Sequence, residues 1–164
     1  MARVFISHSM KHDPGSGVVI ERLLRDFDRK EIELVWDRDL LQVGDDWNDT
    51  LLTEMETCDG AIILVGASAL QRPYVVLECT LLARRKWYSK KWGGNLFELL
   101  VVLVGGVKPE DLSDPAKSNL KDIQLGDYQA GTDDDLDVLV GALKPSLERL
   151  KLVFGGSGPR RQLL

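Results

Sequence analysis

The sequence AIILV at residues 61–65 and the sequence LLVVLV at residues 99–104 decide the fold of this chain. Both are continuous runs of aliphatic and β-branched residues, without a polar residue at every second position. A strand of this kind is buried on both faces, as in a parallel sheet that helices cover on each side. We therefore expect two central strands of a parallel sheet at these positions.

Three further strands follow from weaker versions of the same pattern. VFI at residues 4–6 is a short buried run, and ELVW at residues 33–36 is more mixed, as expected nearer an edge of the sheet. A fifth strand around residues 123–125 has the weakest pattern.

Helical patterns lie between these strands. Apolar residues three or four apart predict a helix over residues 17–29, and a second helix opens around residues 46–49. A third begins at Pro73 and ends near Gly93, and a last amphipathic helix follows residues 133–135. Strands alternating with helices predict an α/β fold: a three-layer, flavodoxin-like open parallel sheet of about five strands, with helices on both faces.

Composition predicts one soluble domain. The chain has 164 residues, a net charge of −5, 44% hydrophobic and 29% charged residues, all ordinary for a globular domain. We expect the domain to span residues 1–154, with residues 155–164 as a flexible linker to an absent sensor domain or as a plain tail. Two cysteines, Cys58 and Cys79, are expected inside helices as free thiols. With neither a signal peptide nor a membrane-spanning run expected, the predicted location is cytoplasmic.

Several chemical classes fit the sequence poorly. Gly15-Ser16-Gly17 lacks the third glycine of a dinucleotide-binding turn, and no glycine loop is followed by Gly-Lys-Ser/Thr, which excludes a P-loop. His8 and His12 are the only histidines, and no cysteine stands at a zinc-ligand spacing from them. We therefore expect no metal site.

A basic and aromatic cluster lies at residues 84–92, where Arg and Lys alternate with Trp and Tyr. Such a cluster can bind nucleic acid, but cations at the end of a helix also complement its dipole. The acidic net charge favours the second interpretation, with a protein contact as an intermediate possibility.

Polar residues follow three of the predicted strands, at residues 7–9, 37–39 and 66–68. In open parallel sheets, ligands bind outside the carboxyl ends of the strands. These positions are therefore the expected functional rim.

Glu78 is the unusual residue of the chain. Apolar residues surround it on most of the third helix, and Tyr74 precedes it by four residues on the same face. A carboxylate in such surroundings usually has a hydrogen-bonding or charged partner, or a catalytic or binding role. The other interpretation is a glutamate near the helix start on a thin polar strip.

Taken together, five segments resemble those of a TIR (Toll/interleukin-1 receptor) domain, in the family's order and spacing across residues 3–88. They are residues 3–9, 36–39, 43–47, 58–65 and 68–78. Two departures stand out: Tyr74 occupies a position where the family usually has tryptophan, and the Phe-Trp box of animal receptors is missing. The second departure indicates the prokaryotic branch.

The resemblance implies an NAD⁺ glycohydrolase or cyclase that acts as an assembly-activated effector in prokaryotic immunity or virulence, such as antiviral defence. It assigns the catalytic role to Glu78, with Tyr74 beside the nicotinamide or ribose. Ser7, His8 and Ser9 would donate hydrogen bonds to ribose or phosphate. Arg38 and Trp47 flank a loop that in the family often completes the site of a neighbouring subunit. NAD⁺ is the substrate, and no separate cofactor is implied.

Two other functions stay open. One is a non-catalytic TIR module that works by self-association or by binding a partner. The other is an enzyme similar to the nucleoside deoxyribosyltransferases, whose related fold also uses a glutamate on ribose. The sequence does not choose between linear and cyclic ADP-ribose as product.

Overall fold

A computed structural model of the chain describes these residues: 1–8, 13–27, 32–36, 47–92, 96–112, 120, 125–128 and 133–154. Five parallel strands form one sheet, in the order β2-β1-β3-β4-β5. The strands are β1 (Ala2–Ser7), β2 (Ile32–Trp36), β3 (Gly60–Val65), β4 (Glu98–Val104) and β5 (Leu125–Tyr128). The predicted α/β fold is confirmed, and β2 lies at an edge as expected.

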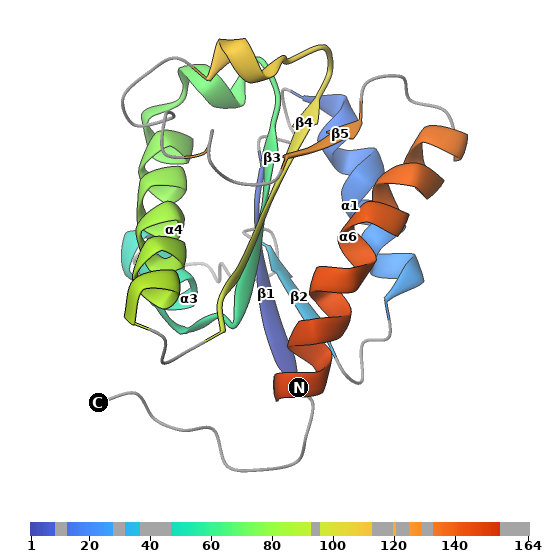
Figure 1. Cartoon of the computed structure of the whole chain (residues 1–164). Coiled ribbons are helices and arrows are strands. Elements are labelled where there is room, and N and C mark those ends of the chain that lie inside the picture. The colour runs from blue at the N-terminus through green and yellow to red at the C-terminus, as the bar shows by residue number, and fades with distance from the viewer. Residues whose placement is uncertain are drawn as a thin grey trace.

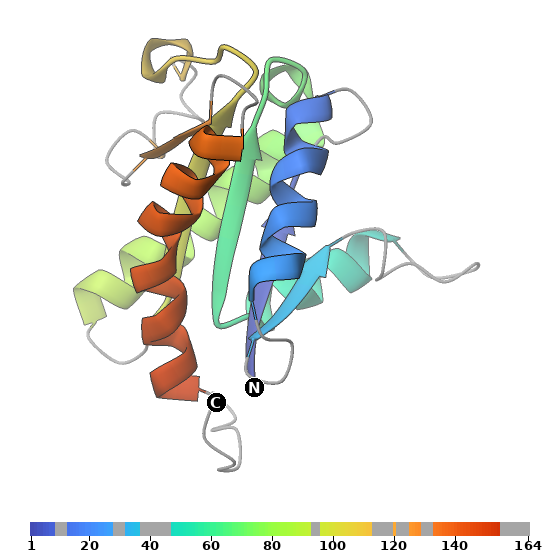
Figure 2. The ribbon, with the colours of Figure 1, turned by 90° about the vertical axis from the view of Figure 1, so that its right-hand side faces the viewer.

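Helices cover both faces of this sheet, as Figure 1 shows. The long helices are α1 (Pro14–Asp26), α3 (Trp47–Thr57), α4 (Pro73–Trp92) and α6 (Asp133–Phe154). Helices α1 and α6 lie side by side on one face (Figure 2), and α3 and α4 lie on the other. Two short 3₁₀ helices, η1 (Ala69–Gln71) and η2 (Pro109–Asp111), follow β3 and β4 at the carboxyl ends of the strands.

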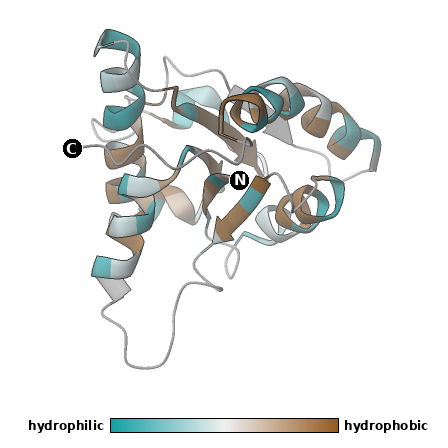
Figure 3. Ribbon diagram, turned by 90° about the horizontal axis from the view of Figure 1, so that it is seen from below, coloured by the Kyte–Doolittle hydropathy of each residue, from teal (hydrophilic) through white to brown (hydrophobic). Residues whose placement is uncertain are grey.

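The central strands are buried from both sides because each supplies side chains to two cores. All residues of β3 and β4 are buried. Ile62 and Leu64 of β3 pack with residues of α1 and α6, whereas Ala61 and Ile63 pack with residues of α3 and α4. Figure 3 shows the result as hydrophobic strands between helices whose hydrophilic residues face outward. The uninterrupted apolar runs of the sequence follow from this double burial.

Helix α1 begins earlier than predicted, at Pro14 instead of residue 17. Gly15-Ser16-Gly17 therefore belongs to the first turn of the helix and not to a loop. Proline suits this position because its fixed φ is helical and the first N–H of a helix has no partner within it. The apolar spacing could not reveal this turn, since its buried residue is Ser16.

Two other predictions about local structure change. Strand β5 overlaps the predicted fifth strand at Leu125 and extends beyond it to Tyr128, and residues 123 and 124 lie outside the described residues. Cys58 follows the last residue of α3 and is not within a helix, whereas Cys79 lies in α4. Neither cysteine forms a disulfide bond, and both are buried.

The strand order places a topological switch point between β1 and β3. The chain passes from β1 to β2 on one side and then returns to form β3 on the other side of β1. In doubly wound sheets of this order, ligands bind at such a point, outside the carboxyl ends of the strands. The ends of β1 and β3 are therefore the part of the sheet to inspect for a site.

The described helices include none that is long and apolar enough to cross a membrane. The expected tail at residues 155–164 lies outside the described residues, so the domain boundary at residue 154 stays a prediction.

Candidate functional site

A buried serine and a buried glutamate meet at the carboxyl end of β1. Ser7 is the last residue of β1, and Glu78 lies in the second turn of α4. The Ser7 hydroxyl donates a hydrogen bond to Oε2 of Glu78. Only 1% of Ser7 and 3% of Glu78 is exposed. The structure thus brings together two residues that are 71 positions apart and were both predicted for the site.

Helix α4 places Glu78 in its apolar stripe. Val75, Cys79 and Leu82 are buried in the core under α4, and Glu78 stands between them at the i, i+3, i+4, i+7 spacing of a helix face. It is the one acidic residue in the sequence of this helix. The interpretation of Glu78 as part of a thin polar strip is therefore wrong, because the residue occupies a core position.

Burial makes this carboxylate costly for the fold. Moving a carboxylate away from water is unfavourable unless hydrogen bonds replace those of the solvent. The bond from Ser7 is one such replacement, and hydrogen bonds to a charged acceptor are stronger than those between neutral groups. An apolar residue would fill the same position without this requirement. A buried glutamate at this place is therefore a candidate functional residue.

His8, the next residue, lies toward the neighbouring strand. Its ring centroid is 6.2 Å from that of Trp36, with an angle of 59° between the rings. Trp36 ends β2 and His8 directly follows β1, so the two rings lie at the same end of adjacent strands. The sequence did not indicate this contact, because it depends on the register between β1 and β2.

The other predicted site residues are described in part or not at all. Ser9 and Arg38 lie outside the described residues. Trp47 is the first residue of α3, and Tyr74 lies in the first turn of α4, one helical turn before Glu78. Their backbone positions are described, and their proposed contacts with a substrate stay predictions.

Asp13 is a site residue that the sequence reasoning missed. Its carboxylate accepts hydrogen bonds from the backbone N–H groups of Ser68 and Ala69, each at 3.2 Å. An acidic residue directly before Pro14 indicates a cap of α1. The side chain makes no such cap and instead reaches the segment that follows β3.

The basic and aromatic cluster lies in the last turns of α4. Trp87, Tyr88 and Trp92 are more than half exposed, and Nζ of Lys91 lies 4.5 Å from the centroid of the Trp87 ring. Arg85 and Lys86 are partly buried and contact Phe97, through the ring and the backbone carbonyl respectively. The cluster lies several turns after Glu78 in the same helix. Within the described ranges, no group of three or more His, Cys, Asp or Glu residues could hold a metal ion.

The chain matches one protein-family model and is similar to solved structures of the same fold. The model described as "TIR domain" matches residues 4–140. Among solved structures, the chain is similar to the TIR domains of the activated Roq1 resistosome directly recognizing the pathogen effector XopQ. That likeness has 16% identity and a TM-score of 0.53, over 94% of this chain and 86% of the other.

A prokaryotic SEFIR domain is also similar, with 15% identity and a TM-score of 0.48, over 90% of this chain and 99% of the other. A search of curated proteins gave no significant match. At these identities, the likeness to the Roq1 domains supports the fold alone.

Proposed function

Because the match over residues 4–140 makes this chain a member of the TIR-domain family, we propose that it cleaves the bond between nicotinamide and ribose in NAD⁺. Glu78 is the proposed catalytic carboxylate. The observation that carries the proposal is a carboxylate held by Ser7 in a core position of α4. It lies at the switch point of the sheet, where this fold class binds ligands. The resemblance of residues 68–78 to the family's glutamate-bearing segment supports the same role.

One carboxylate suffices for this chemistry. The nicotinamide ring of NAD⁺ is a cation and leaves as a neutral base, taking the electrons of the C1′–N bond, so no general acid is required. Positive charge develops on the ribose as the bond breaks, and a carboxylate stabilises this oxocarbenium-like state. Water then adds to C1′ and releases a proton, giving linear ADP-ribose. Attack by a nucleophile of the same substrate gives a cyclic product.

The neighbouring residues have supporting roles in the proposal. The bond from Ser7 to Oε2 orients the Glu78 carboxylate, which is a role beyond the contact with substrate first expected of this serine. His8 and Ser9 supply donors for ribose or phosphate, and Tyr74 packs beside the nicotinamide or ribose.

Assembly is the proposed activating step. Arg38 and Trp47 flank the segment that would complete the site of a second copy of the domain. The similar Roq1 structure contains TIR domains within an activated resistosome, and we extend the idea of assembly from that protein to this one. Dependence on assembly suits an effector of prokaryotic immunity or virulence, because an enzyme that depletes NAD⁺ is toxic when active.

A second candidate function is a non-catalytic TIR module that acts by self-association. The observation in its favour is the burial of Glu78, since 3% exposure leaves the carboxylate covered in the isolated chain. In this alternative, Glu78 and Ser7 form a structural polar pair that fixes α4 on β1.

The first experiment measures nicotinamide release from NAD⁺ by the dispersed domain and by the domain clustered on a multivalent scaffold. We expect turnover in the clustered form and a loss of about 100-fold or more in kcat for Glu78→Gln. Glu98→Gln is the matched control, because Glu98 is a buried carboxylate at the opposite end of the sheet.

Turnover of the control, of Glu78→Gln and of the clustered wild type together distinguishes the two candidate functions. Glu98→Gln should keep its turnover at a temperature where it remains folded. Equal turnover by Glu78→Gln and wild type would contradict the catalytic role of Glu78. Complete inactivity of clustered wild-type protein would favour the non-catalytic module.

A further inference from the structure

A second polar contact joins the connection after β1 to the connection after β3, whereas the Ser7–Glu78 bond joins β1 to α4. Asp13 lies in the connection from β1 to α1, and its carboxylate accepts from Ser68 N and Ala69 N in the connection from β3 to α4. Only 9% of Asp13 is exposed. The contact crosses the switch point between β1 and β3, where two independent connections diverge.

Gly66 makes room for this carboxylate. A Cβ atom at Gly66 would lie 2.3 Å from Cγ of Asp13 and 2.5 and 2.7 Å from its two oxygens. These distances are far shorter than van der Waals contact. The positive φ angles among the described glycines belong to Gly105 and Gly106. Gly66 is therefore required for space and not for backbone conformation.

The held segment leads directly to the proposed catalytic residue. Ala69 begins η1 and is fully buried, and α4 starts at Pro73 only two residues after η1 ends. Glu78 follows in the second turn of α4. A displacement of residues 66–69 would therefore move the start of α4, and with it Glu78 relative to Ser7 on β1. Misplacing a reacting group by about 1 Å can cost about 100-fold in rate.

We propose that Asp13 is a positioning residue that, with the space left by Gly66, fixes the start of α4 so that the Glu78 carboxylate meets Ser7. This inference rests on the proposed function for its effect on catalysis. The contact between Asp13 and the segment after β3 is independent of that function. Asp13 itself is not proposed to touch the substrate.

The experiment is a double-mutant cycle on Asp13 and Gly66 with Gly60→Ala as control. Gly66→Ala should reduce the equilibrium constant for folding by about 10- to 100-fold in the wild-type background, because the new methyl group displaces the carboxylate. With Asp13→Ala, the same substitution should change it by about threefold or less. Gly60→Ala also introduces a clash, with Leu150 at 2.6 Å, but its cost should be equal in both backgrounds.

Turnover provides the test of positioning. In the clustered form, Asp13→Ala should lower kcat by about 10- to 100-fold and change the KM for NAD⁺ by about threefold or less. Asp13→Asn can still accept from one of the two N–H groups, so it should fall between wild type and Asp13→Ala and should remain folded if Asp13→Ala does not. A variant that loses only stability would regain wild-type kcat at a lower temperature.

Hydrogen exchange separates this inference from the proposed function. The amides of Ser68 and Ala69 should exchange faster in Asp13→Ala than in wild type, whether or not the protein cleaves NAD⁺. If wild type is inactive, non-additive effects of Asp13→Ala and Ser7→Ala on unfolding, by about threefold or more, would still support positioning. Equal costs of Gly66→Ala in both backgrounds would overturn the proposal. So would an unchanged kcat in an active, folded Asp13→Ala protein.

Discussion

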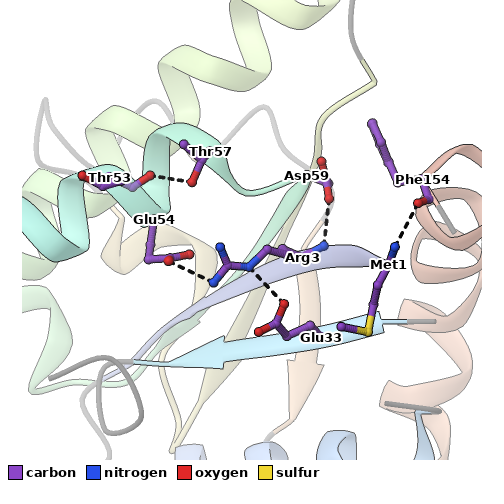
Figure 4. A network of polar contacts seen from close by, with 8 residues as sticks. All are labelled: Met1, Arg3, Glu33, Thr53, Glu54, Thr57, Asp59 and Phe154. Atoms are coloured by element: carbon purple, nitrogen blue, oxygen red, sulfur yellow. Dashed lines mark hydrogen bonds and ion pairs between the residues drawn. The ribbon is translucent and has the colours of Figure 1, made fainter. Parts of the chain in front are cut away.

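The two ends of the sheet hold their carboxylates in different ways. At the amino end, Arg3 contacts Glu33 at 3.1 Å and Glu54 at 2.9 Å, and its backbone N–H donates to Asp59. Figure 4 shows this network between β1, β2 and α3. Glu98, at the start of β4, likewise contacts Lys86 at 3.6 Å and Arg149 at 3.0 Å. Cations from both helical layers thus neutralise the buried end of β4.

At the carboxyl end, the hydrogen bonds described above come from neutral donors. Glu78 accepts from a hydroxyl group, and Asp13 accepts from two backbone N–H groups. The described contacts at the amino end join strands to one another and to helices through ion pairs. Those at the carboxyl end join β1 to α4, and the segment before α1 to the segment after β3, through hydrogen bonds from neutral groups. The comparison teaches that opposite charges hold the amino end together, whereas the carboxyl end depends on hydrogen-bond geometry.

Replacing the buried polar groups by apolar ones, first at the carboxyl end and then at the amino end, should have the largest effects. With Ser7→Ala and Glu78→Met together, we expect no NAD⁺ cleavage and a smaller loss of unfolding free energy than the sum of the losses in the two single variants, because each single change leaves the other buried group without this partner. Both partners of a costly buried pair are then replaced by groups that pack without hydrogen bonds. Chemical denaturation and nicotinamide release measure the two effects.

Glu98→Met is the matching change at the amino end. It should lower the free energy of unfolding by about 1–3 kcal/mol, because Lys86 and Arg149 lose a shared partner. Turnover of the folded protein should persist. Additive stability losses from Ser7→Ala and Glu78→Met would contradict a direct pair at the carboxyl end, and no loss from Glu98→Met would contradict the role of the ion pairs at the amino end.

The pKa of the Cys58 thiol reports the cost of placing a negative charge in the buried amino end of the sheet. Burial raises the pKa of the Cys58 thiol from 9.0 to about 11, although Arg85 lies 3.2 Å from the sulfur and favours the thiolate. The unfolded chain therefore loses this proton at a lower pH than the folded chain. Between pH 9 and 11, the free energy of unfolding of wild type should therefore fall by about 2 kcal/mol more than that of Cys58→Ala.

The measurement is the unfolding free energy of both proteins across that pH range. Below about pH 8 the difference between them should be nearly constant, because the thiol is then protonated in both states. A difference that stays constant up to pH 11 would show that the buried thiol ionises as readily as an exposed one.

Arg3→Lys should have the smallest effect. Lysine keeps the charge but cannot contact Glu33 and Glu54 with separate nitrogens of one planar group. We expect a loss of about 1 kcal/mol, with part of the difference removed by 1 M salt, because the pair to Glu33 is partly exposed. Thermal unfolding of both proteins at low and high salt checks this. A larger loss that salt does not change would point to packing of the Arg3 side chain.

Much of the fold could be predicted from local patterns. The runs at residues 61–65 and 99–104 lie in the central strands β3 and β4, and Pro73 begins α4 as expected. The start of α1 could not, because its first turn contains glycine and a buried serine instead of an apolar residue. The predicted fifth strand overlaps β5 at Leu125, and its extension to Tyr128 was missed because the sequence LGDY has little strand character.

The candidate site was predicted less evenly. Glu78 attracted notice because a lone acid in an apolar helix is rare, and Ser7 because it ends a strand. Asp13 was not singled out, because an acidic residue directly before Pro14 indicates at most a helix cap and gives no sign of a contact with residues 68 and 69. The partner of a side chain depends on segments brought together by the sheet, and no local pattern records which segments these are.

The sequence by itself determined the alternation of strands and helices, the burial of the sheet and the residue types available at its carboxyl end. Local periodicity is sufficient for this, because the faces of a strand or helix are fixed by its geometry. Only the tertiary structure decided that Ser7 meets Glu78 and that Asp13 reaches across the switch point to Ser68 and Ala69. Those contacts depend on β1 and β3 being neighbours, which is a property of the strand order and of no single segment.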